Sequence, residues 1–231
     1  MENGPQSGRR RFYGRRKGHR LSDRRQHLIE TLLPRVAIDL KTLAPERLGA
    51  LFEPPVRGVW LEIGFGGGEH IVWQAERHRD VGLIGCEPFI NGVAKVLSDI
   101  EERELGNVRL HPDDARDVLA WLPDAAIERA FILFPDPWPK KRHRRRRLIS
   151  SEMLDSLARV LVSGAELRMA SDIAEYAAAM LQAMLQHPAF DWTAERPQHW
   201  RDRPDDWPQT RYEEKARLQA RRPYFLTFCR L

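Results

Sequence analysis

The sequence is poor in cysteine and contains no long apolar run. Only Cys86 and Cys229 occur among its 231 residues, and their spacing offers no metal site. Each lies in an apolar, strand-like run, which is typical of a reduced, buried thiol in a cytosolic protein. No apolar run approaches the roughly 20 residues that span a bilayer, and the basic N-terminus lacks the apolar core of a signal peptide. These absences predict a cytoplasmic protein with no membrane segment and no bound metal.

The sequence also lacks an internal repeat and the length for two complete domains. Its 231 residues are enough for one sizeable core. Residues 1–20 are rich in Gly, Arg and Ser, which predicts a basic arm that is disordered unless RNA orders it. Residues 21–231 are expected to form a single domain. Within it, residues 21–55 are predicted to be an accessory helical segment, because an apolar cluster around Leu28 precedes Pro34.

Positive charge is concentrated in two blocks. The net charge is +5, but Arg and Lys are dense over residues 9–25 and again over 140–147. Such blocks attract polyanions without reading their sequence. A solvated or disordered run is the simpler interpretation of the first block, whereas the second lies inside the predicted fold. The residues of the second block that we expect to contact RNA are Lys141, Arg142, Arg144, Arg145, Arg146 and Arg147.

A glycine-rich loop follows the first predicted strand. The apolar stretch 59–63 runs into residues 64–68, which include four glycines, and an amphipathic stretch over residues 69–79 comes next. Strand, glycine turn and helix in this order are typical of the first unit of a nucleotide-binding βαβ fold. Glycine lets the backbone approach a ligand where a Cβ atom would collide.

The residues around this loop favour a cationic ligand over a dinucleotide. A dinucleotide fingerprint has glycine at its first, third and sixth positions. Gly64 and Gly66 supply two of them, but the sixth position is Glu69, whose carboxylate would lie close to phosphate. Glu62 precedes the loop, and residues 62–68 resemble the first motif of class I methyltransferases. Their donor, S-adenosylmethionine, carries an ammonium and a sulfonium; a nicotinamide site and a ligand-free turn are the alternatives.

Acidic residues follow the second and third predicted strands. Glu87 lies about 20 residues beyond the glycine loop, the position from which a carboxylate binds both ribose hydroxyls; its alternative role is to cap the helix predicted over residues 91–104. Asp113 and Asp114 follow the third strand. Either could accept a hydrogen bond from an adenine amino group or shape the turn, and spacing alone does not separate them.

Two further acids follow the fourth and fifth strands. Asp136 lies in a proline-rich stretch over residues 135–139, in which the prolines stiffen the turn and Trp138 offers a stacking face. A proline-stabilised turn with a core tryptophan is the simpler interpretation, and the basic block next to it argues for a binding role. Asp172 follows the fifth strand, but it also fits the N-cap of a capping box with Glu175.

The order of predicted elements indicates an α/β fold. Five α/β repeats are followed by two strands, over residues 190–194 and 224–229. This order predicts a Rossmann-like class I methyltransferase fold: a seven-stranded, mostly parallel sheet with a late antiparallel strand and helices on both faces. Ligands bind such sheets beyond the carboxyl ends of the strands. We therefore expect one rim to gather the strand-end acids Glu62, Glu87, Asp114, Asp136 and Asp172.

Four stretches together resemble the bacterial tRNA (guanine-N7-)-methyltransferase family. They are residues 61–68, 85–88, 134–143 and 210–213, and the resemblance extends from about Gly14 to Leu231. Pro139 and the length of the N-terminal tail depart from the family pattern. The resemblance implies methyl transfer from S-adenosylmethionine to N7 of guanosine 46 in the variable loop of tRNA.

The resemblance also implies which residues form the site. Asp136 is the implied catalytic residue. The cofactor-binding residues are predicted to be Glu62, Gly64, Gly66, Gly68, Glu87, Asp114 and Asp136. The substrate-binding residues are predicted to be Lys140, Asp172, Thr210, Arg211, Tyr212 and Glu213.

The chemistry of the target atom sharpens this expectation. Guanine N7 has a lone pair and no proton, so its attack on a methyl group requires no general base. We expect Asp136 to position guanine and offset the charge that develops on the ring, and Glu213 to accept hydrogen bonds from guanine N1 or N2. The expected partner is tRNA, with no obligatory protein partner, and the chain as a monomer or homodimer. Methylation of another RNA or a small molecule, and RNA binding without catalysis, are the alternatives.

Overall fold

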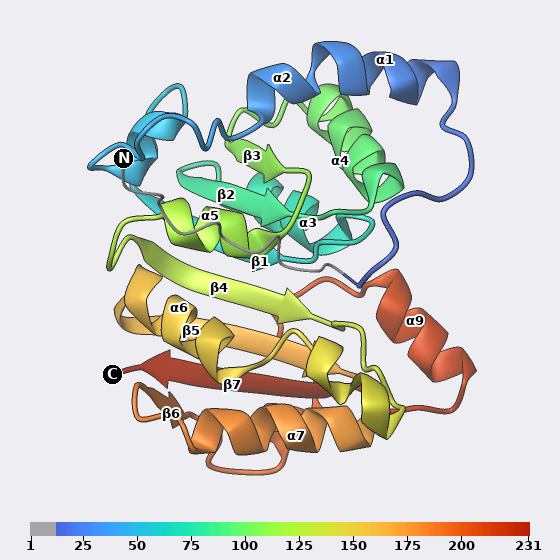
Figure 1. Cartoon of the computed structure of the whole chain (residues 1–231), viewed down its shortest axis with the longest axis vertical. Coiled ribbons are helices and arrows are strands. Elements are labelled where there is room, and N and C mark those ends of the chain that lie inside the picture. Colours follow the sequence, from blue (N-terminus) through green and yellow to red (C-terminus); the bar gives the residue numbers. More distant parts are fainter. Residues whose placement is uncertain (1–12) are drawn as a thin grey trace, which may run out of the picture.

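One twisted sheet organises the chain in the computed structural model, which describes residues 13–231 (Figure 1). Its seven strands lie in the order β3-β2-β1-β4-β5-β7-β6. The first five pair in parallel, and β7 is antiparallel to both β5 and β6. The strands are β1 (Gly58–Ile63), β2 (Val81–Cys86), β3 (Val108–His111), β4 (Ile127–Leu133), β5 (Leu161–Ser171), β6 (Phe190–Trp192) and β7 (Tyr224–Arg230). The predicted fold class is confirmed.

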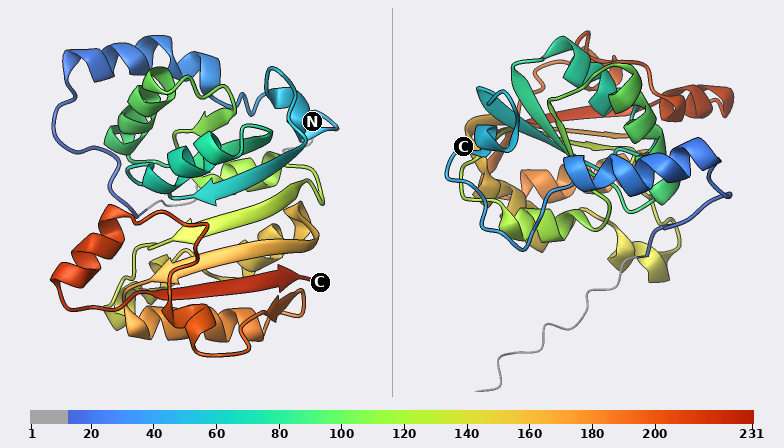
Figure 2. Two further views of the ribbon diagram at one scale, coloured as in Figure 1. Left: turned by 180° about the vertical axis from the view of Figure 1, so that it is seen from behind. Right: turned by 90° about the horizontal axis from the view of Figure 1, so that it is seen from above.

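Helices cover both faces of this sheet (Figure 2). Every residue of β1 and β2 is buried as a result, which explains why these strands have few polar positions. Apolar residues of α3 and α4 pack in one core and those of α5, α6 and α7 in the other. These helices are α3 (Glu69–Arg77), α4 (Ile90–Glu102), α5 (Ala115–Trp121), α6 (Ser151–Val160) and α7 (Ala174–Leu185).

Shorter helices surround this framework. An accessory helical segment was predicted before the first strand, and α1 and α2 lie there, with Leu28 and Val36 buried in the same core as α4. A 3-10 turn, η1, precedes β1, and another, η2, follows β4. Two more helices lie between β6 and β7. These elements are α1 (Asp23–Thr31), α2 (Leu33–Val36), η1 (Leu48–Leu51), η2 (Lys141–Arg146), α8 (Gln198–Arg201) and α9 (Arg211–Leu218).

The part of the N-terminal arm that is described differs from the predicted disorder. Residues 1–12 lie outside the described residues, but residues 13–20 are held against the start of α4. The backbone N–H of Ile90 donates to Arg16 O at 3.0 Å. Asn91 accepts from the N–H of Gly18 at 2.8 Å and donates to His19 O at 2.7 Å. The composition of the arm could not reveal these contacts, because the residues that it contacts lie more than seventy positions later in the sequence.

The two cysteines differ in their surroundings. Cys86 is buried at the end of β2, and burial strongly raises the pKa of its thiol. Cys229 is half-buried on β7 and therefore departs from the expectation of a buried thiol. Both are free thiols. Within residues 13–231 no helix has the length and apolar character needed to cross a bilayer.

Candidate active site

A cavity of about 700 Å³ opens where β1, β2 and β4 end. The last residues of these three strands contribute to its walls. Of the residues predicted to bind cofactor, substrate or RNA, the cavity brings together Gly64, Gly66, Glu87, Asp114, Asp136, Tyr212, Arg145, Arg146 and Arg147. Its size lies within the range of small-molecule sites. The carboxyl edge of the sheet therefore carries a cavity in the place where the sequence predicts a site.

The glycine loop lines one side of this cavity. Gly64 and Gly66 have φ values of +77° and +55°, a left-handed backbone that disfavours any side chain. At Gly66 an added Cβ would also lie 2.9 Å from the Tyr212 hydroxyl. Gly68 differs from the prediction: it is the N-cap of α3, its Cβ would meet Val96, and it does not line the cavity. Its requirement for glycine is therefore structural.

Glu87 is fixed at the wall of the cavity by two backbone donors. One carboxylate oxygen accepts from Gly66 N at 2.7 Å and the other from Phe89 N at 2.9 Å. Burial is the main reason why the pKa of Glu87 is raised, although these two donors oppose the shift. Phe89 is the N-cap residue of α4, so the same side chain supports the helix start and faces the cavity. A carboxylate with four lone pairs can accept further hydrogen bonds here.

Glu62 is not placed as the sequence predicts. Its side chain is 2 % exposed, does not line the cavity, and lies 2.7 Å from Nδ1 of His70. The reason is its position inside β1, where every residue is buried between helices. Glu62 therefore lies behind the glycine loop, bonded to a histidine that the sequence alone did not single out.

The two acids that follow β3 have different surroundings in the structure. Asp114 lines the cavity, and as the N-cap of α5 it accepts hydrogen bonds from Arg116 N at 3.0 Å and from the Arg116 guanidinium. Asp113 instead forms a bidentate pair with Arg16, at 2.7 and 3.2 Å, and does not line the cavity. Asp114 is therefore the acid in position to contact a ligand.

Asp136 lies in the most strained turn of the site. The residues two positions before and after it, Phe134 and Trp138, have φ values of +52° and +40° although neither is glycine. Such conformations cost roughly 1–3 kcal/mol each and concentrate at functional sites. Asp136 faces the open cavity, and partial burial by the surrounding walls raises its pKa. The ring of Phe134 stacks on that of Tyr212, with centroids 6.0 Å apart and an angle of 14° between the planes.

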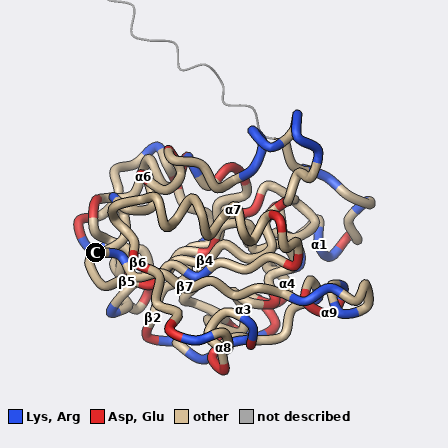
Figure 3. The backbone as a smooth tube through the Cα atoms, turned by 90° about the horizontal axis from the view of Figure 1, so that it is seen from below, with Lys and Arg blue, Asp and Glu red and all other residues tan. Residues whose placement is uncertain are grey.

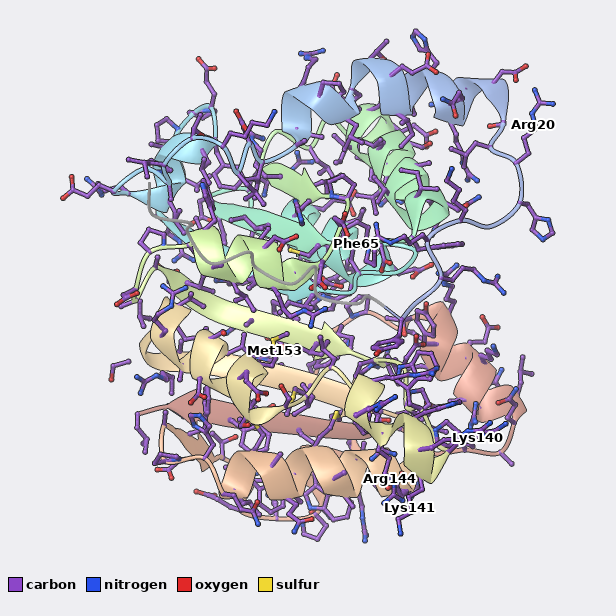
Figure 4. All side chains as sticks on the ribbon, viewed as in Figure 1. Arg20, Phe65, Lys140, Lys141, Arg144 and Met153 are labelled. Atoms are coloured by element: carbon purple, nitrogen blue, oxygen red, sulfur yellow. The ribbon has the colours of Figure 1, made fainter. Side chains whose placement is uncertain are left out.

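The basic segment after β4 divides into exposed and partly buried cations. Lys140, Lys141 and Arg144 lie together at one edge of the molecule, beside α7 (Figure 4). Arg145 lines the cavity, and Arg146 also does so, with its guanidinium over the rings of Tyr13 and Trp138 at 4.7 and 5.0 Å. Figure 3 shows further Lys and Arg residues on α9.

Arg147 departs from its predicted role in RNA binding. Its side chain is 8 % exposed, pairs with Glu175 and lies over the ring of Tyr176 at 4.6 Å. Its Nε also donates to Pro137 O at 2.9 Å. These contacts occupy the guanidinium inside the protein, so we assign Arg147 to holding the turn that carries Asp136.

The segment that begins α9 closes one end of the cavity. Within the predicted stretch 210–213, only Tyr212 lines the cavity. Thr210 is the N-cap of α9, accepting from Glu213 N at 3.3 Å, and Arg211 lies 3.7 Å from Glu69. Glu213 is buried, which raises its pKa, and within the described structure its Oε1 has no hydrogen-bond partner.

Asp172 and Lys140 lie outside the cavity walls. Asp172 is not a helix cap, because α7 begins at Ala174 and its N-cap is Ile173. Its carboxylate pairs instead with Arg221 at 2.9 Å. The structure thus ties the end of β5 to the loop that follows α9, a contact between residues about fifty positions apart that no local pattern indicates.

Several cavity residues were not predicted. Tyr13, Gly14 and Arg15 come from the arm, and Ser150, Met153 and Ser156 come from α6 and its N-cap. The serine N-cap of α6, whose Oγ accepts from Met153 N at 3.3 Å, was a usable signal for where that helix begins. Nothing in the sequence indicated that the arm folds back to this edge of the sheet.

Comparison with known proteins agrees with this geometry. Residues 57–226 match a family model described as a putative methyltransferase. The chain is 53 % identical over 223 residues to the tRNA (guanine-N(7)-)-methyltransferase of Rhodospirillum rubrum, covering 95 % of this chain and 88 % of that protein. It is 47 % identical to the protein of the same name from a Chelativorans species, covering 100 % and 99 %.

Solved structures are similar in fold. An rRNA methylase from Streptococcus thermophilus superposes with a TM-score of 0.52 at 13 % identity, covering 75 % of this chain and 87 % of that one. An antibiotic-related methyltransferase gives a TM-score of 0.51 at 16 % identity, covering 76 % and 89 %. At such low identity the likeness concerns the fold alone.

Proposed function

The chain belongs to the tRNA (guanine-N7-)-methyltransferase family, and we propose that it transfers a methyl group from S-adenosylmethionine to N7 of guanosine 46 in the variable loop of tRNA. The observation that carries this proposal is the cavity itself. Acids from three strand ends converge there beside a segment of exposed cations. A cationic methyl donor suits the first group of side chains and a polyanionic substrate suits the second.

The walls of the cavity fit S-adenosylmethionine. Its methyl group is electrophilic because it is bonded to a positively charged sulfur. Glu87 would accept from the two ribose hydroxyls while keeping its bonds to Gly66 N and Phe89 N. Asp114 would accept from the adenine amino group. Gly64 and Gly66 would let the backbone lie against the amino-acid part, because neither projects a side chain into the cavity.

Asp136 is the proposed catalytic residue. Guanine N7 offers a lone pair and no proton, so no residue of this chain has to act as a base. The N7–carbon bond forms as the carbon–sulfur bond breaks, and positive charge moves onto the purine. A carboxylate held at the rigid turn after β4 can orient the base and stabilise that charge.

The RNA side of the site consists of cations, aromatic rings and one acid. Lys140, Lys141 and Arg142 would contact phosphates. Tyr212 would stack on the extruded base, as aromatic side chains do in single-stranded RNA recognition. Glu213 does not line the cavity, so the predicted contact with guanine N1 or N2, which would select against adenine, requires its buried side chain to turn toward the base.

The proposal is tested by locating the product. Purified protein is incubated with methyl-labelled S-adenosylmethionine and an unmodified tRNA transcript, and the RNA is then cleaved at 7-methylguanosine. We expect cleavage at position 46, and none in a matched transcript with adenosine there. Label in RNA at another position would refute the assigned site, and label only in small molecules would favour a small-molecule methyltransferase. Binding of tRNA without any transfer would favour an RNA-binding protein.

A further inference from the structure

A buried chain of hydrogen bonds runs behind the glycine loop and ends on Glu62. His70 and Gln74 lie one turn apart on α3 and face the same way. The carbonyl of Asp206 accepts from the Gln74 amide at 2.9 Å, and Nε2 of Gln74 lies 3.2 Å from Nε2 of His70. Nδ1 of His70 then lies 2.7 Å from a carboxylate oxygen of Glu62. Both Glu62 and His70 side chains are 2 % exposed.

The direction of these bonds determines which nitrogen of His70 carries its proton. A carbonyl oxygen only accepts, so the Gln74 amide must present its NH₂ group to Asp206. That group has two hydrogens, so the second is available to Nε2 of His70, 3.2 Å away, and we infer that Nε2 is the acceptor. Nδ1 then carries the single proton and donates it to Glu62. The network consequently defines a neutral imidazole, protonated at Nδ1.

The ring is also fixed by its neighbours. Its centroid lies 4.5 Å from that of Phe131 and 5.3 Å from that of Trp207. The far end of the chain is anchored as well, because the Asp206 carboxylate accepts two hydrogen bonds from Arg168, at 2.7 and 2.8 Å. Neither the ring nor its partners can turn without breaking buried contacts, so the donor that faces Glu62 is preorganised.

We propose that His70 is a positioning residue for the methyl donor: as a neutral Nδ1–H imidazole it orients Glu62 and leaves that buried carboxylate its full negative charge behind the glycine loop. This inference rests on the proposed function. Glu62 immediately precedes Ile63 and Gly64, which line the cavity, so its charge acts on a cation bound there through a short, poorly screened path. An imidazolium would cancel that charge. The ordinary alternative is a core histidine that only satisfies its own hydrogen bonds.

The state of the ring can be measured without substrate or activity. Nitrogen-15 NMR of the imidazoles in the ligand-free protein at neutral pH distinguishes Nδ1–H, Nε2–H and imidazolium forms, and His70→Gln identifies the resonance. We expect a protonated Nδ1 and an unprotonated Nε2 for His70. An Nε2–H ring or an imidazolium would overturn the proposal.

A matched pair of variants tests the consequence for binding. The amide of asparagine can replace Nδ1 of histidine, whereas the amide of glutamine can replace Nε2. In calorimetry with S-adenosylmethionine, we expect His70→Gln to weaken binding about tenfold or more, because Glu62 loses its donor, and His70→Asn to stay within about threefold. His78→Asn and His78→Gln are controls: His78 follows the same helix but packs against the ring of Trp60 in a tilted arrangement, and both should bind like the wild type.

The outcomes separate this inference from the function on which it rests. Equal loss in both His70 variants would show that the ring only fills space, and wild-type binding in His70→Gln would show that it positions nothing. If the unaltered protein bound no S-adenosylmethionine, the proposed function would fail, while the NMR result would still decide the state of His70. Circular dichroism melting of each variant distinguishes loss of binding from loss of fold.

Discussion

The glycine-loop region and the basic segment after β4 hold their charges in opposite ways. At the glycine loop, Glu62 and Glu87 are buried; Glu87 accepts from two backbone N–H groups, and Glu62 lies 2.7 Å from Nδ1 of His70. On the side formed by the segment after β4, Lys140, Lys141 and Arg142 are exposed to solvent. Buried, oriented charges act strongly and at short range, whereas exposed ones act at longer range and are screened by salt. The first arrangement suits one small cation, and the second suits a large polyanion that must be attracted and released.

The largest effect is expected where the two sides meet, at Asp136. Asp136→Asn keeps the shape of the side chain but removes its charge, so methyl transfer should fall about a hundredfold or more. Affinity for S-adenosylmethionine should change much less, which calorimetry would show. A rate in the unaltered enzyme that follows a single deprotonation near neutral pH, and that this variant abolishes, would instead indicate that Asp136 acts as a base.

Removing charge from the glycine-loop side should weaken cofactor binding. In Glu87→Gln the amide can no longer accept from both Gly66 N and Phe89 N while also binding a diol. We expect the dissociation constant for S-adenosylmethionine to rise about tenfold to a hundredfold, with tRNA affinity little changed. Glu46→Gln is the control, because Glu46 is an exposed acid that does not line the cavity. Equal effects in the two variants would contradict a specific role for Glu87.

Removing charge from the basic side should weaken tRNA binding instead. Alanine at Lys140, Lys141 and Arg142 together should lower tRNA affinity about tenfold at physiological salt. It should also reduce the slope of log affinity against log salt by roughly 0.7 to 0.9 for each phosphate that the variant no longer neutralises. The control removes three other exposed cations, Arg35, Lys41 and Arg47. An equal drop in affinity in the control would mean that only net charge matters.

Arg147 belongs to the basic segment in sequence but to the protein interior in structure. Arg147→Ala removes the pair with Glu175 and the hydrogen bond to Pro137 O, so the free energy of unfolding should fall by about 1–2 kcal/mol. Arg145→Ala, next to the same turn but exposed, should leave stability within about 0.5 kcal/mol. Urea denaturation measures both, and the reverse order would contradict the assignment of Arg147 to the interior.

A modest pH dependence should arise from the acids of the cavity. Burial raises the pKa of Glu87 and Asp136, so the folded protein holds protons that the unfolded chain has released. Stability should therefore decrease as pH rises through the ordinary carboxyl range and just above it. Affinity for S-adenosylmethionine should increase severalfold over the same interval, because a cation prefers ionised acids. Affinity that falls as pH rises there would contradict the proposed binding mode.

The sequence predicted the framework and many of the residues that line the cavity for local reasons. Each parallel strand is followed within three residues by an acid or a glycine, and the carboxyl ends of parallel strands share one edge. Glu87, Asp114 and Asp136 consequently meet at one cavity. The same rule could not show that Glu62, one position before the end of β1, lies behind the loop with His70.

Other features depend on contacts between distant residues, which no local pattern contains. Residues 13–20 are ordered by Asn91 and Asp113, and Asp172 is paired with Arg221. Arg147 looks like its neighbours in sequence, but Glu175 and Tyr176 take it into the interior. Charge and composition therefore predicted which kinds of residue surround the cavity, while the tertiary contacts determine which of them remain available to a ligand.

The most direct test of this contrast between buried acids and exposed cations measures how salt affects the binding of each ligand to the unaltered protein. Dissociation constants for S-adenosylmethionine and for tRNA would be determined between about 50 and 400 mM salt, a range over which phosphate contacts weaken strongly. If buried acids bind the methyl donor and exposed cations bind tRNA, the dissociation constant for S-adenosylmethionine should stay nearly constant with salt. The dissociation constant for tRNA should rise steeply, with its logarithm linear in the logarithm of the salt concentration. Steep salt dependence for both ligands, or for neither, would contradict it.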